Sequence, residues 1–394
     1  MSTGNAASDQ RRAATSPDEI RSFARRYKRR RIDTVSHAST SVNVVGIGLG
    51  DLGRLELRTL AALDGVDLVA GADVSPDARE AFAEEHDIPT YESYEEMLDA
   101  EDADAACIVT PHTLHYDQAR ACLDRGVHVH LEKPMVTDLD HARDLQRRAD
   151  EAGLVLAVGY QRHVDWRFQK IRRLIDEGAI GDLHMAACFL EQVWISFAEE
   201  QWRGNPALSG GGQLYDSGSH LLDALLWTTR TDPVSVAAAV DNRGHDVDVN
   251  SALAVTLDRN GDRVTASVGV SGAGRSTPAP GEGLHFWGTE GRISLGDDTL
   301  TVESNGEIEV EEAHEPQFEE LTEAKLQNFV DAIRGDAELV IPATDAIGVT
   351  ALTEASYEAA ESGRTVAIDA FGGVESASLD ASAEATTTEP GDDD

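Results

Sequence analysis

The stretch SVNVVGIGLGDLG, residues 41–53, decides the fold that this sequence predicts. Residues 41–47 form a short apolar run rich in β-branched side chains, which is typical of a buried strand. GLGDLG at 48–53 then follows the pattern GxGxxG, and the apolar spacing after it predicts a helix to about Leu63. A GxGxxG pattern alone is a weak signal, but between a strand and a helix it indicates a dinucleotide-binding turn.

Each glycine of this turn has its own physical role. Gly48 permits the tight turn, Gly50 lets the backbone approach a pyrophosphate, and Gly53 lets the helix pack on the strand. The phosphates would then meet the free N–H groups at the start of the helix. The residues expected to form this part of a cofactor site are Gly48, Gly50, Asp51, Leu52 and Gly53. A glycine-rich turn without a ligand is the structural alternative.

A dinucleotide site also needs an acidic residue at the end of the next strand, where the adenosine ribose binds. VDLVAGAD, residues 66–73, places Asp73 there, 23 residues beyond Gly50. Its carboxylate would accept hydrogen bonds from the ribose and repel a 2′-phosphate, so NAD is favoured as the cofactor. Ser75 and Arg79 could accommodate a phosphate, and NADP therefore remains open.

The rest of the chain alternates strands and helices in its first half, which predicts an α/β fold with a parallel, doubly wound sheet. Further strands are expected at 66–73, 89–91, 104–110, 127–132 and 154–160, and further helices at 76–86, 114–125 and 138–152. The second half is expected to contain alternating strands at 183–194 and 234–303, then helices at 316–334 and 343–362.

The composition argues against two classes of partner. The net charge is −39 at pH 7, and binding nucleic acid or an anionic membrane requires clustered cations. Only four of the 33 basic residues are lysines, a style that resembles the proteins of salt-loving archaea. In molar salt the Debye length falls to about 3 Å, so the self-repulsion is screened. An ordinary acidic protein is the alternative.

The cysteines and the apolar runs indicate a cytoplasmic protein. Cys107, Cys122 and Cys188 are odd in number and scattered, which fits a reducing compartment better than a disulfide scaffold. No run approaches the ~20 apolar residues that span a bilayer, and we expect no signal peptide.

The two ends of the chain differ in composition from the middle. Residues 1–40 carry nine Lys/Arg against four Asp/Glu, and we expect a disordered basic extension. The RRYKRRR run at 25–31 could instead be a nucleic-acid or partner arm. Residues 371–394 are rich in Ser, Ala, Thr and acids and are expected to form a disordered acidic tail.

One lysine stands in an unusual place. HVHLEKPMV, residues 128–136, puts Lys133 directly before a proline at the end of a predicted strand. An isolated Lys-Pro is usually a surface turn, but open α/β sheets bind ligands at the carboxyl ends of their strands. A compact ammonium differs from an arginine fork in that its pKa can be tuned, so we expect Lys133 in the site. The Lys133–Pro134 bond is a candidate cis peptide that would hold it there.

Five ordered motifs together resemble the Gfo/Idh/MocA oxidoreductases between about Val42 and Asp369. They are GLGDLG, Asp73, TPHTLH at 110–115, LEKP at 131–134 and GGGQLYDSGSH at 210–220. The resemblance implies an NAD(P)-binding Rossmann domain, here 41–160. It also implies an α+β substrate-binding and oligomerisation domain, here 161–370, with a large, mostly antiparallel sheet. That sheet often forms a subunit interface, so a homodimer or homotetramer is expected.

The resemblance also carries roles onto particular residues. Lys133 matches the lysine that reaches both the nicotinamide ribose and the substrate hydroxyl. Asp216 and His220 match the acid and the histidine of the D-x-x-x-H motif. The residues that match the loops beside the cofactor are Thr110, Pro111, His115 and Glu132.

The chemistry of alcohol oxidation needs the same residue types, because a proton must leave oxygen while a hydride leaves carbon. We expect His220 to accept the proton, Lys133 to stabilise the developing alkoxide, and Asp216 to anchor the substrate or the imidazole. Asp223 could orient His220, or cap internal polar groups. A buried polar pair or a plain helix cap is the alternative for Asp216 and His220, and no metal is expected.

Two positions depart from the family pattern. Glu56 stands where many members have a histidine, and YQRH gives Arg162 then His163 where paired arginines are common. The expected substrate-binding residues are Tyr160, Arg162, His163, Trp202 and Arg203, together with Asp216 and His220. A role in the hydrophobic core is an equally good interpretation of a tryptophan such as Trp202.

The leading hypothesis is therefore an NAD(P)-dependent dehydrogenase acting on a sugar, a sugar derivative or a cyclitol. A non-catalytic relative that binds dinucleotide and senses a metabolite is the alternative. Retention of Lys133, Asp216 and His220 together disfavours a sensor. Imine or biliverdin-type reduction on the same fold is a third possibility, for which the D-x-x-x-H motif is dispensable.

Overall fold

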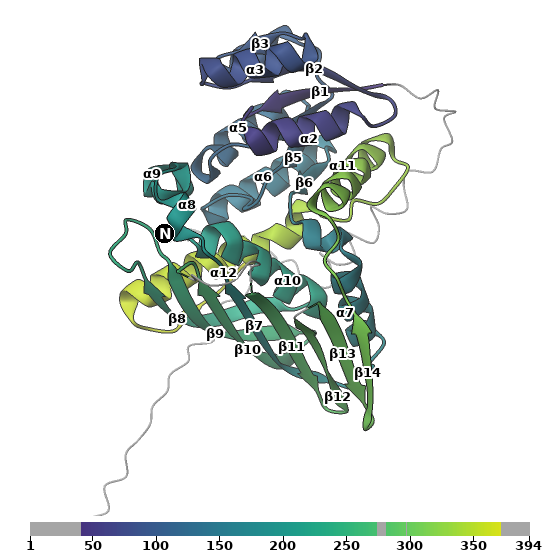
Figure 1. The fold of residues 1–394 in the computed structure, drawn as a ribbon, viewed down its shortest axis with the longest axis vertical. Coiled ribbons are helices and arrows are strands. Elements are labelled where there is room, and N and C mark those ends of the chain that lie inside the picture. The colour runs from purple at the N-terminus through teal and green to yellow at the C-terminus, as the bar shows by residue number, and fades with distance from the viewer. Residues whose placement is uncertain (1–40, 274–280, 297, 372–394) are drawn as a thin grey trace, which may run out of the picture. The chain divides into compact units, whose positions relative to one another are not determined.

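The structure, a computed structural model, describes residues 41–273, 281–296 and 298–371. The predicted extension at 1–40 and, apart from Phe371, the predicted tail at 371–394 lie outside the described residues. Two β-sheets organise the described part of the chain (Figure 1). None of its helices is long and apolar enough to cross a membrane.

The first sheet has six parallel strands in the order β3-β2-β1-β4-β5-β6. Its strands are β1 (Val42–Ile47), β2 (Val66–Ala72), β3 (Thr90–Tyr91), β4 (Ala105–Ile108), β5 (His128–Leu131) and β6 (Leu156–Val158). Its helices are α2 (Asp51–Ala61), α3 (Pro76–His86), α4 (Tyr94–Ala100), α5 (His115–Leu123) and α6 (Leu139–Ala152). The order reverses between β1 and β4, which opens a crevice at the carboxyl ends of the strands. The predicted doubly wound sheet is confirmed.

Local sequence explains why these elements begin and end where they do. Neighbouring Val44 and Val45 are both fully buried, so β1 is covered on both faces, as a parallel strand requires. Helix α3 begins with a proline, and the side chain of Ser75 before it accepts a hydrogen bond from Ala78 N. Asp138 caps α6 in the same way.

The second sheet has nine strands in the order β14-β13-β12-β11-β7-β10-β9-β8-β15. They are β7 (Leu183–Glu191), β8 (Asp232–Asp241), β9 (Asn250–Arg259), β10 (Asp262–Ser271), β11 (Gly281–Gly288), β12 (Gly291–Gly296), β13 (Thr299–Ser304), β14 (Glu307–Glu312) and β15 (Val366–Ala367). All described pairs are antiparallel except β7 with β10, which is parallel. The predicted mostly antiparallel sheet is confirmed.

Helices separate the two sheets. Helix α12 (Ala343–Ser362) contacts both β8 and α6, and α10 (Ser219–Thr229) packs against α12 and α7 (Trp166–Asp176) (Figure 1). Helix α11 (Phe318–Arg334) instead packs against α2 of the first sheet. One continuous apolar core includes residues of both sheets, so the carboxyl ends of the first sheet are held against the helical face of the second.

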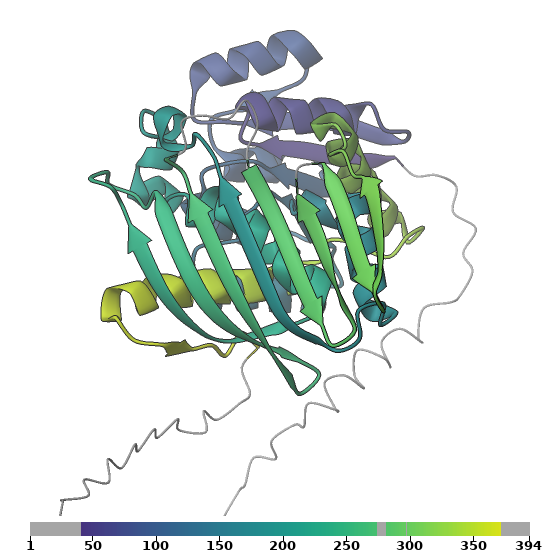
Figure 2. The same ribbon diagram turned by 60° about the horizontal axis from the view of Figure 1, so that its bottom comes forward.

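The other face of the nine-stranded sheet carries no helix of the described chain (Figure 2). Three rows of side chains cross it on four adjacent strands, β7, β10, β9 and β8. The rows are Met185, Thr265, Thr256 and Ser235; Ala187, Ser267, Ala254 and Ala237; and Phe189, Gly269, Ala252 and Ala239. None of these side chains is charged, although 27% of the chain's residues are.

Several elements were not predicted from the sequence, among them β14, α4 and α7. Strand β14 lies at the sheet edge and is mostly exposed, but Ile308 and Val310 alternate with glutamates in EIEVEE, so the period-two pattern of a strand was there to detect. Helix α4 has only seven residues. The signal for α7 was present, because Phe168, Ile171 and Ile175 recur at helical spacing and are buried. The domain boundary at 160/161 stays a prediction.

Candidate active site

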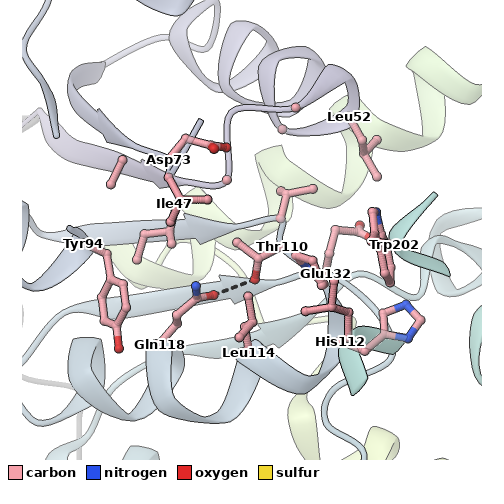
Figure 3. Close-up of a pocket in the computed structure, with 18 of the residues that line it drawn as sticks. Ile47, Leu52, Asp73, Tyr94, Thr110, His112, Leu114, Gln118, Glu132 and Trp202 are labelled. Carbon is pink, nitrogen blue, oxygen red and sulfur yellow. Dashed lines mark hydrogen bonds between the residues drawn. The ribbon is translucent and has the colours of Figure 1, made fainter. Parts of the chain in front are cut away.

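A cavity of about 610 Å³ lies at the carboxyl ends of β1, β2, β4 and β5 (Figure 3). Several predicted cofactor residues line it, namely Gly48, Gly50, Asp51, Leu52, Gly53, Asp73, Thr110, Pro111, Glu132 and Lys133. Residues that the sequence had not singled out also line it, among them Tyr94, His112, Leu114 and Gln118. The sheet order alone predicts a site at this crevice, because it lies where the strand order reverses.

The glycine turn has the shape that a bound pyrophosphate requires. A Cβ atom on Gly48, whose φ is +94°, would lie 2.1 Å from the Val109 carbonyl oxygen, and one on Gly53 would lie 2.1 Å from the Gly48 carbonyl oxygen. A Cβ on Gly50 would meet nothing within 4 Å. Packing therefore requires the first and last glycines, while the middle one leaves open space at the helix N-terminus, and the turn fits a dinucleotide.

The carboxylate of Asp73 is fixed by the backbone at the cavity wall. Its Oδ2 accepts a hydrogen bond from Leu49 N at 2.7 Å, and its Oδ1 accepts one from Ser75 N at 2.8 Å. The side chain of Ser75 caps α3, and Arg79 Nη1 donates to the Asp73 carbonyl oxygen at 2.6 Å. Both groups that could accommodate a 2′-phosphate are thus engaged locally, whereas the acidic residues Asp73 and Glu92 line the cavity.

Two histidines support the loop after β4. His115 does not line the cavity, because its ring is buried with Nδ1 2.9 Å from Pro134 O and Nε2 2.9 Å from Thr110 O. His112 does line it, and its Nδ1 donates to Ser209 O at 2.9 Å. Burial lowers the pKa of His112 to about 3, against the opposing charge of Asp216, so its ring is neutral at neutral pH.

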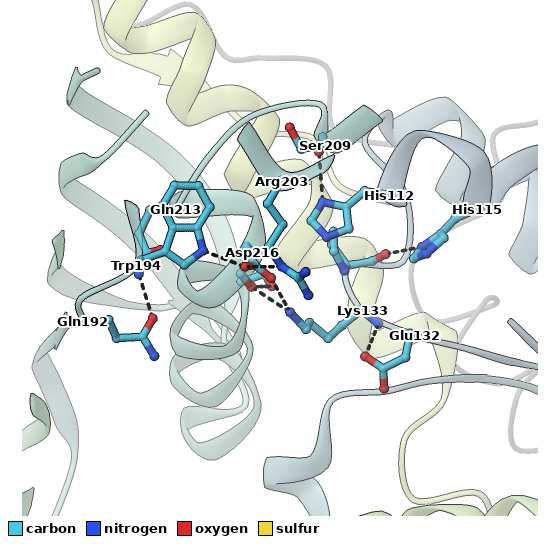
Figure 4. Close-up of polar contacts among 12 residues, drawn as sticks. His112, His115, Glu132, Lys133, Gln192, Trp194, Arg203, Ser209, Gln213 and Asp216 are labelled. Carbon is cyan, nitrogen blue, oxygen red and sulfur yellow. Dashed lines mark hydrogen bonds and ion pairs between the residues drawn. The ribbon is translucent and has the colours of Figure 1, made fainter. Parts of the chain in front are cut away.

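Lys133 and Asp216 form a buried ion pair (Figure 4). Lys133 Nζ donates to Asp216 Oδ1 at 2.8 Å, and the Lys133–Pro134 peptide is cis, as the sequence had suggested. Asp216 Oδ2 accepts hydrogen bonds from Trp194 Nε1 at 2.7 Å and Arg203 Nε at 3.1 Å. Burial alone would raise the pKa of Asp216, but the charges of Lys133 and Arg203 outweigh it and hold the pKa well below its usual range.

The turn that carries Asp216 is a five-residue π-helix, Leu214–Gly218, directly before α10. A buried carboxylate on another segment holds its start. Asp248 Oδ1 accepts hydrogen bonds from Gly212 N at 2.5 Å and Tyr357 Oη at 2.6 Å, and its Oδ2 accepts one from Leu214 N at 2.9 Å. π-helical turns occur often at functional sites, and Asp248 therefore fixes the direction in which Asp216 points.

A second cavity of about 580 Å³ lies between Lys133 and the second sheet. Lys133 lines both cavities, and His220 lines the second. Burial lowers the pKa of His220 well below 6.5, and the charges of Lys133 and Arg162 lower it further. His220 is therefore neutral at neutral pH and able to accept a proton.

The predicted substrate residues divide between the two cavities. Arg162 lines the second, whereas Trp202 and Arg203 line the first. Tyr160 and His163 are buried and line neither cavity. Polar residues of the second cavity that the sequence had not singled out are Gln161, Gln192, Ser217 and Glu282.

Of the two roles that the sequence left open for Asp223, the structure shows contact with an internal polar group and not with His220. Asp223 Oδ1 lies 2.9 Å from His163 Nε2, and His163 stacks on Trp227 with ring centroids 4.3 Å apart. The i+7 spacing had suggested that Asp223 could orient His220, but a π-turn replaces regular helix at Asp216 and changes the register of the side chains. Asp223 instead neutralises a buried histidine behind the site.

Behind the first cavity lies a buried cluster of one lysine and two glutamates. Lys325 of α11 contacts Glu132 Oε1 and lies 2.5 Å from Oε1 of Glu56 on α2. Glu132 Oε2 accepts the Lys133 backbone N–H at 3.1 Å. Burial would lower the pKa of Lys325, but the two carboxylates outweigh it and raise the pKa above its usual value. Glu56, which stands where many family members have a histidine, is therefore explained by its ion pair with Lys325.

Glu56 also lies near Cys107 and His130, at a spacing that would suit a metal ion. Lys325 already supplies a cation to Glu56, and burial raises the pKa of the Cys107 thiol well above its usual value. We therefore assign this cluster to structure.

The six-stranded order and the glycine turn define a dinucleotide-binding protein, and comparison with known proteins identifies the family. Residues 42–160 match the oxidoreductase family with an NAD-binding Rossmann fold, and residues 168–294 match the GFO/IDH/MocA C-terminal domain. The chain belongs to the Gfo/Idh/MocA family of oxidoreductases.

Individual relatives cover most of the chain. The rhizopine catabolism protein MocA of Rhizobium meliloti is 27% identical over 324 residues, which is 79% of this chain and 93% of that protein. The scyllo-inositol 2-dehydrogenase (NADP(+)) IolW of Bacillus subtilis is 26% identical over 300 residues, 70% of this chain and 82% of that protein. GenD2 from gentamicin A biosynthesis, solved in complex with NAD, has the same fold with a TM-score of 0.72 at 22% identity, over 86% of this chain and 99% of that one.

We predict that Lys325→Met will lower the free energy of unfolding by about 3–5 kcal/mol, because two buried carboxylates lose their cation. The difference in free energy of unfolding between the variant and the unmodified protein should become smaller as the pH is lowered, since the unpaired carboxylates then take up protons. Denaturant unfolding at several pH values in constant KCl would measure both effects.

Lys170→Met is the matched control. Lys170 also contacts a glutamate, Glu311, but both side chains are partly exposed, so its loss should change the stability by less than about 1 kcal/mol. Equal losses of stability in the two variants would show that the buried cluster contributes no more to stability than an exposed ion pair.

Proposed function

We propose that this oxidoreductase transfers a hydride between NAD(P) and a secondary alcohol of a sugar, a sugar derivative or a cyclitol. The single observation that carries the proposal is the position of Lys133, whose side chain lines the cofactor cavity and the second cavity together. A substrate in the second cavity would place a hydroxyl beside this ammonium, and the nicotinamide, when bound, accepts or donates the hydride.

The residues around Lys133 supply the proton chemistry. Neutral His220 accepts the proton that leaves the hydroxyl, and Lys133 stabilises the negative charge that develops on oxygen. Asp216 holds the ammonium in place through the 2.8 Å contact. The same three groups act in reverse when a carbonyl is reduced.

The names of the relatives support the substrate class. One is a scyllo-inositol 2-dehydrogenase, and another, from Ensifer adhaerens, is a 1,5-anhydro-D-fructose reductase that is 27% identical over 330 residues. Both act on a polyhydroxylated ring. A sensor would need to bind a dinucleotide and a metabolite, but it would not need a base and a paired ammonium beside the metabolite.

We predict that His220→Ala will lower kcat for alcohol oxidation by about 10²–10⁴-fold, because the proton acceptor is lost, while the Kd for NAD stays unchanged. In the unmodified enzyme the neutral imidazole is required, so activity falls as the pH drops through the His220 pKa. Since that pKa is lowered, the acid limb of kcat/KM should lie below pH 6.5. Assays of aldoses and inositols with NAD and NADP in molar KCl test this.

His184→Ala, an exposed histidine of β7, is the matched control and should leave both constants unchanged. Dinucleotide binding without turnover of any polyol would contradict the enzymatic function. Loss of NAD binding in His220→Ala would show that the residue is structural.

The cofactor preference depends on Asp73, and we propose NAD as the favoured cofactor. Asp73→Ser should raise kcat/KM with NADP relative to NAD by at least about tenfold, because the carboxylate that would repel a 2′-phosphate is removed. Steady-state kinetics with both cofactors measures the ratio. An unchanged ratio of kcat/KM between the two cofactors would show that Asp73 does not contact the ribose.

We also propose that the uncharged rows on the open face of the second sheet form a homo-oligomeric interface. Another copy could cover these three rows without burying a charge, which is unusual in so acidic a chain. Ser267→Arg, at the centre of the middle row, should convert the oligomer to a monomer, because it buries an unpaired charge. Light scattering after size exclusion would measure the mass.

Ala152→Arg places the same charge on the exposed end of α6 and should leave the mass unchanged. A wild-type monomer would contradict the interface.

We further propose a cytoplasmic location in a salt-rich cell, on the strength of the net charge of −39 and three free, buried cysteines.

A further inference from the structure

We propose that the second cavity selects neutral polyols against sugar acids and sugar phosphates, and that Glu282 is the residue that determines this selectivity. The inference rests on the proposed function, because it names the substrate class of the same site. The physical basis of this selectivity is the ion pair between Glu282 and Arg162. Without Glu282, the positive charge of Arg162 would attract an anionic substrate.

Arg162 is held by three groups at once. Its Nη2 donates to Glu282 Oε2 at 2.8 Å, and its Nη1 donates to the His220 carbonyl oxygen at 2.9 Å. The guanidinium carbon lies 5.1 Å from the centre of the Phe168 ring. The Arg162 and Glu282 side chains are 14% and 26% exposed, so the pair is largely shielded from water and its attraction is strong.

The other cations of the cavity are paired as well. Lys133 Nζ lies 2.8 Å from Asp216 Oδ1, and Arg167 Nη2 lies 2.6 Å from Asp165 Oδ2. Among the described residues that line this cavity, every lysine and arginine therefore faces a carboxylate. A carboxylate or phosphate entering the cavity would lose its hydration without gaining an unpaired cation, which is unfavourable.

Further acids make the cavity still less suited to an anion. Glu315 lies 3.6 Å from Arg167 and shares that cation with Asp165, and Asp298 also lines the cavity. Among the described residues, the lining cations are Lys133, Arg162 and Arg167, and the lining carboxylates are Asp165, Glu282, Asp298 and Glu315. The carboxylates thus outnumber the cations, and an anionic ligand would meet net repulsion.

The cavity instead offers partners that suit hydroxyl groups. Glu282 Oε1 is shielded from solvent and lies 2.6 Å from Arg162 Nη2, so it serves the arginine, and other groups are left to meet the hydroxyls. Gln192 Oε1 already accepts from Gln213 Nε2 at 2.9 Å, which leaves its NH₂ group to donate. Ser217 can do either. Neighbouring hydroxyls of a polyol can use such donors and acceptors without bringing in a charge.

The test compares matched neutral and acidic sugars, glucose with glucuronate and galactose with galacturonate, at one KCl concentration. The holoenzyme with NAD should give a higher kcat/KM and a lower Kd by calorimetry for the neutral member of each pair. Glu282→Gln, which keeps the shape of the side chain, should reduce this discrimination by about tenfold, because the freed guanidinium then forms a charge-assisted hydrogen bond with the acid.

Asp298→Asn is the matched control, because it also removes a carboxylate from the cavity wall but frees no arginine, and it should preserve the discrimination. Tighter binding of the acids by the unmodified enzyme would overturn the proposal, as would equal effects of the two variants. Neutral-selective binding without turnover would support it while refuting the proposed function. Binding of neither series would overturn both.

Discussion

The buried ion pair between Lys133 and Asp216 is the interaction on which the arrangement of the site depends. It joins the end of β5 in the first sheet to the π-helical turn before α10, which packs on the second sheet. Neither half of the chain contains both charges. Removing Asp216 would leave Lys133 without its carboxylate, and removing Lys133 would leave Asp216 with Arg203 alone. The pair therefore favours the single docking of the two halves in which both cavities meet at the lysine.

Each member of the pair is positioned from behind by a second carboxylate. Asp248 fixes the start of the π-helical turn through backbone N–H groups, and Glu132 fixes the backbone of Lys133 while Lys325 holds Glu132. The charges are therefore oriented before any substrate arrives. Preorganisation of this kind lowers the energy that the protein would otherwise spend on reorienting dipoles during proton and hydride transfer.

The sequence predicts the parts of this site that depend on local patterns. The glycine turn, the acid after β2, the lysine before a proline and the D-x-x-x-H motif are each contained in a few residues, and their strands and helices were predicted close to their observed bounds. The supporting partners depend on contacts across long sequence separations. Lys325 meets Glu132 from 193 residues away, and Arg162 meets Glu282 from 120 residues away, so no periodicity or motif could pair them.

These contacts explain where the few lysines of the chain are used. Each of the three lysines in the described part of the chain contacts a carboxylate, and the two most buried, Lys133 and Lys325, serve the site directly. An ammonium is compact and points its charge in one direction, whereas a guanidinium needs a wider, planar space. Arginine serves where its planar group has room, at the acidic surface and also beside Glu282 in the second cavity. Lysine remains where a single positive charge must reach between carboxylates in a closed interior, and exchanging it for arginine there would overpack the site.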